Sequence, residues 1–318
     1  MTKKKLRKRD VLIIVLCALL ILAATWIVLR LTASATCSAW SAPPEAECYS
    51  GSEKVFSAMS LSFLVYGCEG CDAPRGAVSE ILDIEKMGII IENADISRTD
   101  PADPSTAMID SATFIRRTVG NYRLITDLKD KKSSFYGAVF ADDATKTVWI
   151  SYSGSVDFKD ALQSMMLVAG PGLSGQEKHA FELYEAALKT EEIQNGYSLL
   201  LTGHSLGGAL ASMVSYMSGA EAVTISGADG LALAKIKSIE PDRPQSYRIT
   251  NYLTSPGGSV FSLKDGVQRM MFWGDYDGIA THTYASNGMV DNSHCVFGFV
   301  QFENDDRSKP ILPEEVTE

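Results

Sequence analysis

Residues 200–211, LLTGHSLGGALA, constrain the fold more than any other part of the chain. An apolar run leads into Gly203-His204-Ser205-Leu206-Gly207, and small residues typical of a packed helix follow. This order predicts a buried strand, a sharp turn around Ser205 and then a helix. Glycines flank the serine because a Cβ at those positions would collide with a neighbouring strand or helix. The serine hydroxyl is therefore predicted to stand clear of the sheet edge, where it can act as a nucleophile.

A nucleophilic serine needs a base, and the chain offers four histidines. His204 adjoins the serine within the turn, so its side chain is expected to point away and to pack beside the turn. His179 lies in an amphipathic helical segment, which suits a surface or core role. A strand, a sharp turn with serine between glycines and a helix resemble the nucleophile turn of α/β-hydrolases. In those enzymes the catalytic residues follow one another along the chain as Ser, then Asp or Glu, then His. That order favours His282, after a Gly/Asp-rich loop, over His294, which enters a final apolar run.

A second motif lies about 50 residues before the serine turn, in residues 147–162, TVWISYSGSVDFKDAL. With the serine turn, it makes residues 135–284 resemble the class 3 (fungal-type) lipase family of α/β-hydrolases. Where that family has an arginine before a glycine, this chain has Ser153. The resemblance implies that Ser155 supplies one oxyanion-hole donor and the backbone N–H of Leu206 the other, which would stabilise a tetrahedral intermediate. An ordinary turn after an edge strand is the alternative interpretation.

Apolar residues recur at helical spacing directly after this motif, in residues 156–169, and Gly170-Pro171-Gly172 ends the pattern. In the resembling family a lid helix occupies this position and opens at a lipid surface. Flexible methionines in the segment would suit contact with acyl chains. A plain core helix fits the same pattern equally well.

The acidic member of the triad is where this chain departs from the family pattern. The predicted strand at residues 246–253 is followed by TSPGGSV, which contains no carboxylate. Asp229 follows the preceding predicted strand and is the acid we expect, although a turn residue would fit there too. Asp265 lies in a predicted hairpin turn. A Ser–His pair without an acid is the remaining alternative, with lower activity because the acid orients the imidazole.

The N-terminus predicts a membrane location. A basic segment, residues 1–10, precedes an uncharged apolar run that nearly spans a hydrocarbon core of ~30 Å at ~1.5 Å per residue. Residues 11–31 are therefore expected to form a transmembrane signal-anchor at the cell membrane. The positive charges should stay in the cytoplasm, with the hydrolase domain outside. Secretion after cleavage at Ala33-Ser34-Ala35 is the alternative.

Cysteine spacing agrees with export from the cytoplasm. Outside the cytoplasm, disulfides Cys37–Cys48 and Cys68–Cys71 are the simplest pairing, and other pairings of these four remain open. A zinc site would need a second ligand pair at suitable spacing. No metal and no organic cofactor is expected.

The rest of the chain predicts one domain. Its elements include a first helix at residues 55–66 and a hairpin that turns at Asp142-Asp143. The predicted fold class is α/β: an α/β-hydrolase with a mostly parallel central sheet flanked by helices. We expect a linker at 32–50, the hydrolase domain at 51–303 and a flexible tail at 304–318. The formal net charge of −10 argues against nucleic-acid binding.

These features together predict a serine esterase or lipase that forms an acyl-enzyme. Acylglycerol or phospholipid-type esters are the substrates that the resemblance implies, and the membrane is a partner through the N-terminal helix. The alternatives are an acyltransferase or peptidase on the same fold, or a catalytically impaired lipase-like surface binding protein. The missing acid and the altered residue before Gly154 motivate the last of these.

Overall fold

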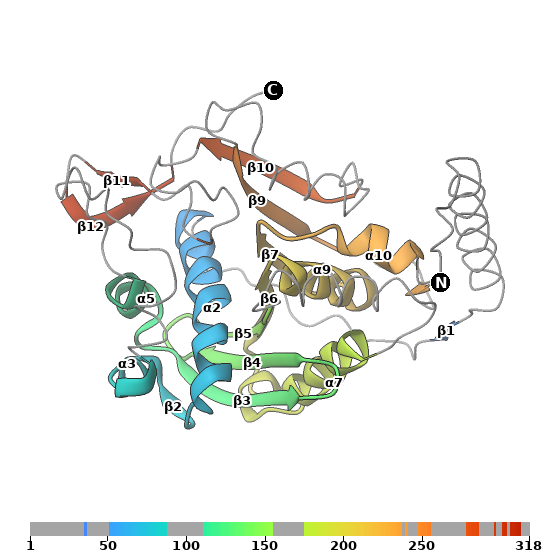
Figure 1. The fold of residues 1–318 in the computed structure, drawn as a ribbon, viewed down its shortest axis with the longest axis horizontal. Helices are drawn as coiled ribbons and strands as arrows, with labels where there is room; N and C mark the ends of the chain where they lie inside the picture. The colour runs from blue at the N-terminus through green and yellow to red at the C-terminus, as the bar shows by residue number, and fades with distance from the viewer. Residues whose placement is uncertain are drawn as a thin grey trace, which may run out of the picture.

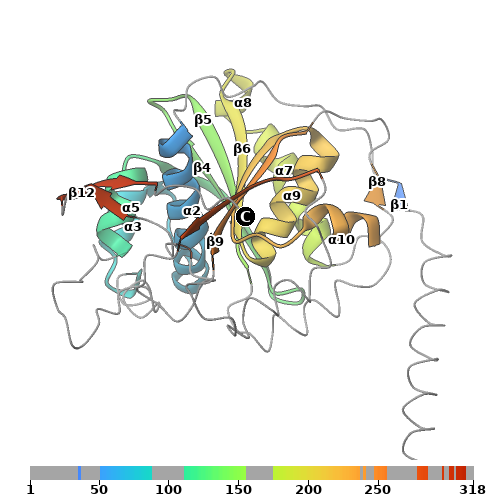
Figure 2. The same cartoon turned by 90° about the horizontal axis from the view of Figure 1, so that it is seen from above.

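The computed structural model describes residues 51–87, 111–154, 175–236, 247–255, 278–285 and 306–312, together with 35–36, 239–240, 296 and 301–303. An eight-stranded sheet forms the centre, with helices on both faces (Figure 1, Figure 2). Its strand order is β10-β9-β7-β6-β5-β4-β3-β2. The strands are β2 (Gly76–Ala77), β3 (Arg123–Asp130), β4 (Phe135–Asp142), β5 (Thr147–Tyr152), β6 (Ser198–His204), β7 (Glu221–Ile225), β9 (Ile249–Ser255) and β10 (Ala280–Ala285).

The sheet is mixed. The pairs β5–β6, β6–β7, β7–β9 and β9–β10 are parallel, and the pairs β2–β3, β3–β4 and β4–β5 are antiparallel. The predicted hairpin is confirmed, because β4 and β5 are joined by a turn that begins at Asp142. Every residue of both strands is buried. Their apolar residues can therefore serve two cores, one on each face of the sheet.

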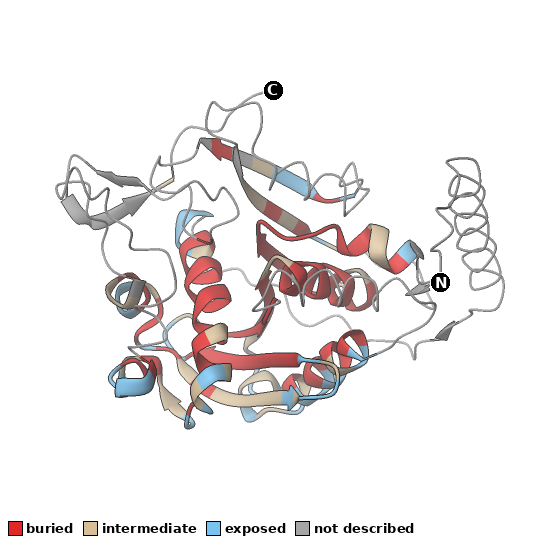
Figure 3. Ribbon diagram, viewed as in Figure 1, coloured by how far each residue is buried: buried red, intermediate tan, exposed pale blue. Residues whose placement is uncertain are grey.

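Strand β4 shows how one strand serves both cores. Tyr136 and Phe140 belong to the cluster on one face, and Phe135 and Val139 belong to the cluster on the other. This division follows from the two-residue alternation of side chains along a β-strand. Figure 3 shows buried residues on both faces of the sheet.

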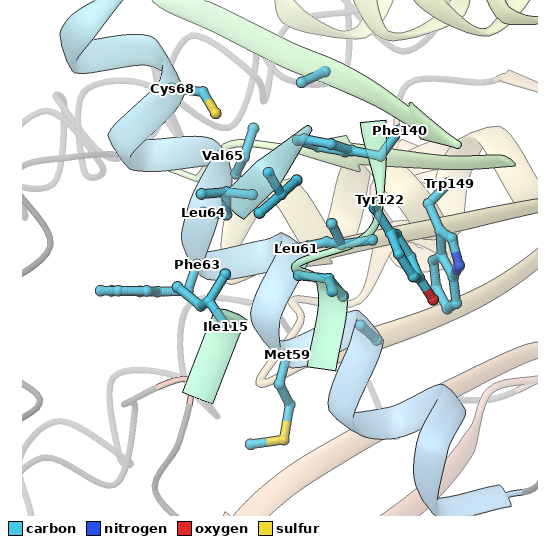
Figure 4. Packing of buried hydrophobic residues seen from close by; sticks show 14 of the residues in the cluster. Met59, Leu61, Phe63, Leu64, Val65, Cys68, Ile115, Tyr122, Phe140 and Trp149 are labelled. Carbon is cyan, nitrogen blue, oxygen red and sulfur yellow. The ribbon is translucent and has the colours of Figure 1, made fainter. Parts of the chain in front are cut away.

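Helix α2 (Gly51–Cys71) covers the first face, beside α3 (Val78–Leu82) and α5 (Ser111–Val119). The predicted first helix is confirmed, and it is longer than the expected 55–66. Figure 4 shows its side chains among those of the sheet, with Leu61, Leu64 and Val65 on the helix and Phe140 and Trp149 on strands.

Serine hydroxyls buried between α2 and the sheet form hydrogen bonds across that contact. Ser62 Oγ lies 2.9 Å from the Thr202 hydroxyl of β6. Ser151 of β5 donates to the Leu61 carbonyl at 3.0 Å. Buried hydroxyls are costly unless hydrogen-bonded, so these contacts allow a serine-containing helix to lie flat on the central strands.

The second face carries α7 (Gln176–Leu188), α8 (Glu191–Gln194), α9 (Leu206–Ser218) and α10 (Gly230–Ile236). Figure 2 shows α2 and α5 on one side of the sheet and α7, α9 and α10 on the other. His179 lies half-buried on α7, where it contacts Glu182 and Asp130 and its ring lies against Phe135.

Two short strand pairs lie outside the main sheet. Strand β1 (Ala35–Thr36) pairs with β8 (Ile239–Glu240), and β11 (Gln301–Glu303) pairs with β12 (Asp306–Ile311). Among the helices that the structure describes, none combines the length and apolarity needed to cross a membrane. The predicted signal-anchor, residues 11–31, lies outside the described residues, as do Cys37 and Cys48.

The predicted Cys68–Cys71 disulfide is wrong, because both cysteines are free thiols at the end of α2. Cβ atoms three residues apart on a helix are separated by about 5–6 Å. A disulfide requires about 3.5–4.5 Å. Cys68 instead packs in the core (Figure 4), where burial raises the pKa of its thiol and keeps it protonated.

Candidate active site

Ser205 occupies the turn between β6 and α9, and its backbone has a conformation that residues other than glycine rarely adopt. Its φ is 57° and its ψ is −122°. A non-glycine residue with such angles costs of order 1–3 kcal/mol and persists only where the surroundings impose it. The predicted strand, turn and helix are therefore present, with the serine at the strained position between them.

Glycines around the serine allow the strand, the helix and a neighbouring loop to approach closely. A Cβ on Gly203 would overlap the backbone of Gly207, and one on Gly207 would overlap the Tyr152 carbonyl of β5. A Cβ on Gly208 would meet the Cα of Gly227 in the loop after β7. The sharp turn thus depends on backbone contacts that a side chain would block, as the sequence motif predicts.

Backbone groups beside Ser205 are suitable for binding an oxyanion. Leu206 is the first residue of α9, and the first N–H groups of a helix have no partner within the helix. The helix N-terminus also carries partial positive charge. Gly154 lies next to the serine, since an ideal Cβ on it would be 3.4 Å from the Ser205 Cβ. Ser155 and the lid-like segment 156–169 lie outside the described residues.

Asp229 is buried directly beside the serine turn. The Ala228 N–H donates to the Ser205 carbonyl at 3.0 Å, which joins the loop after β7 to the turn. The Asp229 carboxylate accepts from the Ala232 N–H at 2.8 Å and so caps the N-terminus of α10. Asp229 thus has a structural role as a helix cap next to the site. Asp265 lies outside the described residues.

His282 lies within strand β10, whereas the sequence suggested a loop. It pairs with Tyr252 of β9, which pairs with Ile225 of β7, which pairs with His204. At about 4.8 Å per strand spacing, the Cα atoms of His204 and His282 are roughly 14 Å apart. His282 therefore lies three strands along the sheet from β6, the strand that leads into Ser205. His294 lies outside the described residues.

The His282 ring stacks on Tyr252, with ring centroids 5.2 Å apart. Tyr252 packs against the α2-side core, so His282 is on the same face of the sheet as His204.

Tyr66 is a residue of this site that sequence reasoning missed. Its hydroxyl lies 3.1 Å from His204 Nδ1 and accepts the Gly154 N–H at 3.1 Å. His204 packs beside the turn and reaches α2, a contact that was not predicted, with its ring edge-on to that of Tyr66. Tyr66 was the last residue of the predicted first helix, and its helical position alone gave no sign of this contact.

Glu69, one turn further along α2 than Tyr66, contacts the end of β5 at Ser153. Its carboxylate accepts from the Ser153 hydroxyl at 3.3 Å. Burial raises the pKa of Glu69, and Lys129 together with the Ser153 hydrogen bond partly offsets that effect. Within the described part of the chain, no group of three or more His, Cys, Asp or Glu side chains could hold a metal ion.

Solved structures with similar folds include several fungal lipases. The mono- and diacylglycerol lipase of Aspergillus oryzae gives a TM-score of 0.40 at 11% identity, covering 66% of this chain and 72% of that one. Lipase II from Rhizopus niveus gives 0.35 at 14% identity, covering 65% and 74%. The Rhizomucor miehei lipase–propeptide complex gives 0.34 at 14% identity, covering 71% and 69%.

The sequence comparison identifies the family directly. Among curated proteins, no sequence matches the chain significantly. A family profile described as phospholipase-like, with a Tle-like phospholipase domain, matches residues 116–282. This range is a little over half of the 318-residue chain and contains the strained serine turn. The chain therefore belongs to the phospholipase-like family that is defined by the Tle-like phospholipase domain.

Proposed function

We propose that the protein is a serine esterase that hydrolyses phospholipid- or acylglycerol-type carboxylic esters. The observation that carries this proposal is the strained Ser205 backbone at the junction of β6 and the N-terminus of α9. The family profile for a phospholipase-like domain supports a lipid ester as substrate. In this proposal Ser205 attacks the ester carbonyl, and water later releases the acyl group from the serine.

Charge on the carbonyl oxygen would be stabilised by the Leu206 N–H and by Ser155, the donor that follows Gly154. Loss of one such donor typically costs about 3–4 kcal/mol of transition-state stabilisation. The position of Leu206 at the start of α9 supports its role, because its N–H points out of the helix end. No metal or organic cofactor is part of the proposed mechanism.

A downstream histidine would take the proton of Ser205 and return it to the leaving alcohol. His282 is the first candidate, because it follows Ser205 and Asp229 in the order used by this fold. Proton transfer needs hydrogen-bond distance, directly or through one water. The register of β10 puts His282 three strands along the sheet from β6, and His294 is kept as the second candidate. Asp229 is the proposed acid.

The proposal is tested by following fatty-acid release from phosphatidylcholine vesicles and from tributyrin, with the full-length chain. We expect Ser205→Ala to lower the rate at least a thousandfold. Of His282→Ala and His294→Ala, only the variant that removes the base should lower it comparably. Wild-type hydrolysis that persists in Ser205→Ala would overturn the proposal. Adding alcohol or amine acceptors separates a hydrolase from an acyltransferase, and a peptide substrate tests for a peptidase.

Asp229→Asn separates the two roles of that residue. Asparagine caps a helix about as well as aspartate, so the midpoint of thermal unfolding should stay near the wild-type value. Loss of the triad carboxylate should lower kcat by up to about 10⁴-fold. If Asp229→Asn keeps the wild-type kcat, Asp229 serves only as a helix cap. The catalytic group would then be a Ser–His pair without an acid.

We also propose that the domain is held outside the cytoplasm at the cell membrane. The basic residues 1–10 followed by the apolar run support this location. Alkaline extraction of expressing cells tests it: the chain should stay in the membrane fraction, and deletion of residues 1–31 should release it. Recovery of a shortened chain in the medium would instead support secretion after cleavage.

A further inference from the structure

We propose that Tyr66 is a positioning residue for the oxyanion-binding side of the site, an inference that rests on the proposed esterase function. Tyr66 lies on α2, outside the residues that the family profile matches. Its hydroxyl connects the two backbone segments between which the ester carbonyl would lie. These segments are the end of β5 and the turn that carries Ser205.

The end of β5 passes from sheet hydrogen bonding to Tyr66 within one residue. The Ser153 N–H still donates to the Tyr136 carbonyl of β4 at 3.0 Å. The next N–H, that of Gly154, donates to the Tyr66 hydroxyl instead. Tyr66 therefore fixes the first peptide beyond the sheet, immediately before Ser155, the proposed oxyanion donor.

The same hydroxyl also fixes His204, the residue before the nucleophile. Burial raises the pKa of Tyr66, so its hydroxyl keeps its proton at neutral pH. Because its oxygen accepts from Gly154, its proton can be donated to His204 Nδ1, which requires His204 to carry its own proton on Nε2. One hydroxyl thus holds both sides of the site at a set distance.

Space around Gly154 shows how closely these parts fit. A Cβ on Gly154 would overlap the Tyr66 hydroxyl and would lie 2.7 Å from the His204 carbonyl. The Tyr66 hydroxyl and the serine turn therefore both lie close against the peptide at Gly154. An error of about 1 Å in a catalytic group can cost about a hundredfold in rate, so a fixed contact here bears directly on turnover.

The test compares Tyr66→Phe with Tyr122→Phe in the full-length chain. Tyr122 is the matched control, because its buried hydroxyl also contacts α2, at Ser57 (3.2 Å), near the other end of the helix. We expect Tyr66→Phe to lower kcat for p-nitrophenyl butyrate roughly 10- to 100-fold with KM within twofold. Binding of a trifluoromethyl ketone, whose serine adduct bears an oxyanion, should weaken by a similar factor. Tyr122→Phe should leave both quantities near wild type.

Equal kcat values for the two variants would overturn the positioning role. A second readout does not depend on activity: in chain labelled with ¹⁵N-histidine, the His204 Nδ1 resonance should shift in Tyr66→Phe and not in Tyr122→Phe. An unchanged resonance overturns the Tyr66–His204 contact. If wild type shows no hydrolysis that depends on Ser205, the proposed function fails, and a shifted resonance would then assign Tyr66 a structural role only.

Discussion

At the scale of single residues, the backbone of Ser205 is the most informative feature. Its φ of 57° is imposed by the close packing of Gly203, Gly207 and Gly208 on their neighbours. Natural proteins often sacrifice stability at catalytic positions to hold a reactive geometry. The strain at Ser205 is therefore expected to be measurable as a stability cost.

Replacing Ser205 by glycine should stabilise the fold, because glycine adopts positive φ without a Cβ clash. Ser205→Ala is the matched control, since alanine keeps the Cβ and also lacks the hydroxyl. We expect the free energy of unfolding of Ser205→Gly to exceed that of Ser205→Ala by about 1 kcal/mol. This value is the relief of strain in the folded state less the cost of the greater entropy that glycine has in the unfolded chain. Urea denaturation measures the difference. A less stable glycine variant would show that the turn is unstrained.

Glu69 should make stability depend on pH. Burial raises the pKa of its carboxyl above the ordinary value of 4.5 in the folded protein. Protonation then favours folding: this contribution is full below pH 4.5 and is lost as pH rises through the folded pKa. Glu69→Gln, which stays neutral, should therefore gain stability relative to wild type as pH rises from about 4.5 to 7. Thermal unfolding across that range measures the trend, with the exposed Glu85→Gln as control. A difference that does not change with pH would contradict the assignment.

At the scale of elements, the site depends on how closely α9 approaches β5 and β6. Gly207 contacts the Tyr152 carbonyl, so the helix begins almost against the neighbouring strand. Gly207→Ala should force these elements apart and lower the free energy of unfolding by about 1–3 kcal/mol. Gly51→Ala, at the open start of α2 with no atom within 4 Å of the added Cβ, should change it by less than about 0.5 kcal/mol. Equal effects in the two variants would mean that the approach of α9 to β5 adjusts freely.

The sequence was sufficient for elements whose pattern is local. The hairpin of β4 and β5 and the strand–turn–helix at Ser205 follow from alternation, turn residues and glycine spacing. The disulfide prediction failed because Cys68 and Cys71 were interpreted by spacing and expected compartment, whereas the helix continues through both. His282 was expected in a loop for a similar reason, since nearby Gly and Asp residues suggested one and β10 begins just after them.

The contacts of Tyr66 and Glu69 with the end of β5 could not have been predicted in this way. They join positions more than 80 residues apart in the chain. Such contacts depend on the angle and register at which α2 lies on the sheet, which no local pattern specifies. The Asp229 cap on α10 is the opposite case, because it is a contact within four residues that a helix-start signal describes.

At the scale of the whole molecule, the mixed sheet brings together segments from distant parts of the chain at one edge. The carboxyl ends of β5, β6 and β7 supply Gly154, Ser205 and Asp229, and α2 contributes Tyr66 from the adjacent face. Figure 1 shows α2 lying beside these strands. Ligands of open α/β sheets typically bind at this edge of the strands. The fold therefore places Gly154, Ser205 and Asp229 at the end of the sheet where ligands of such folds bind.

We propose that Ser205 is an activated nucleophile, and covalent labelling of the full-length chain with a fluorophosphonate tests this directly. Peptide mass spectrometry of the labelled protein locates the adduct. We expect an adduct on Ser205 in wild type and no labelling of Ser205→Ala. Detergent micelles should be tried alongside buffer, because a closed lid would block the reagent. Folded wild type that remains unlabelled in both conditions would contradict the claim and would favour a surface binding protein.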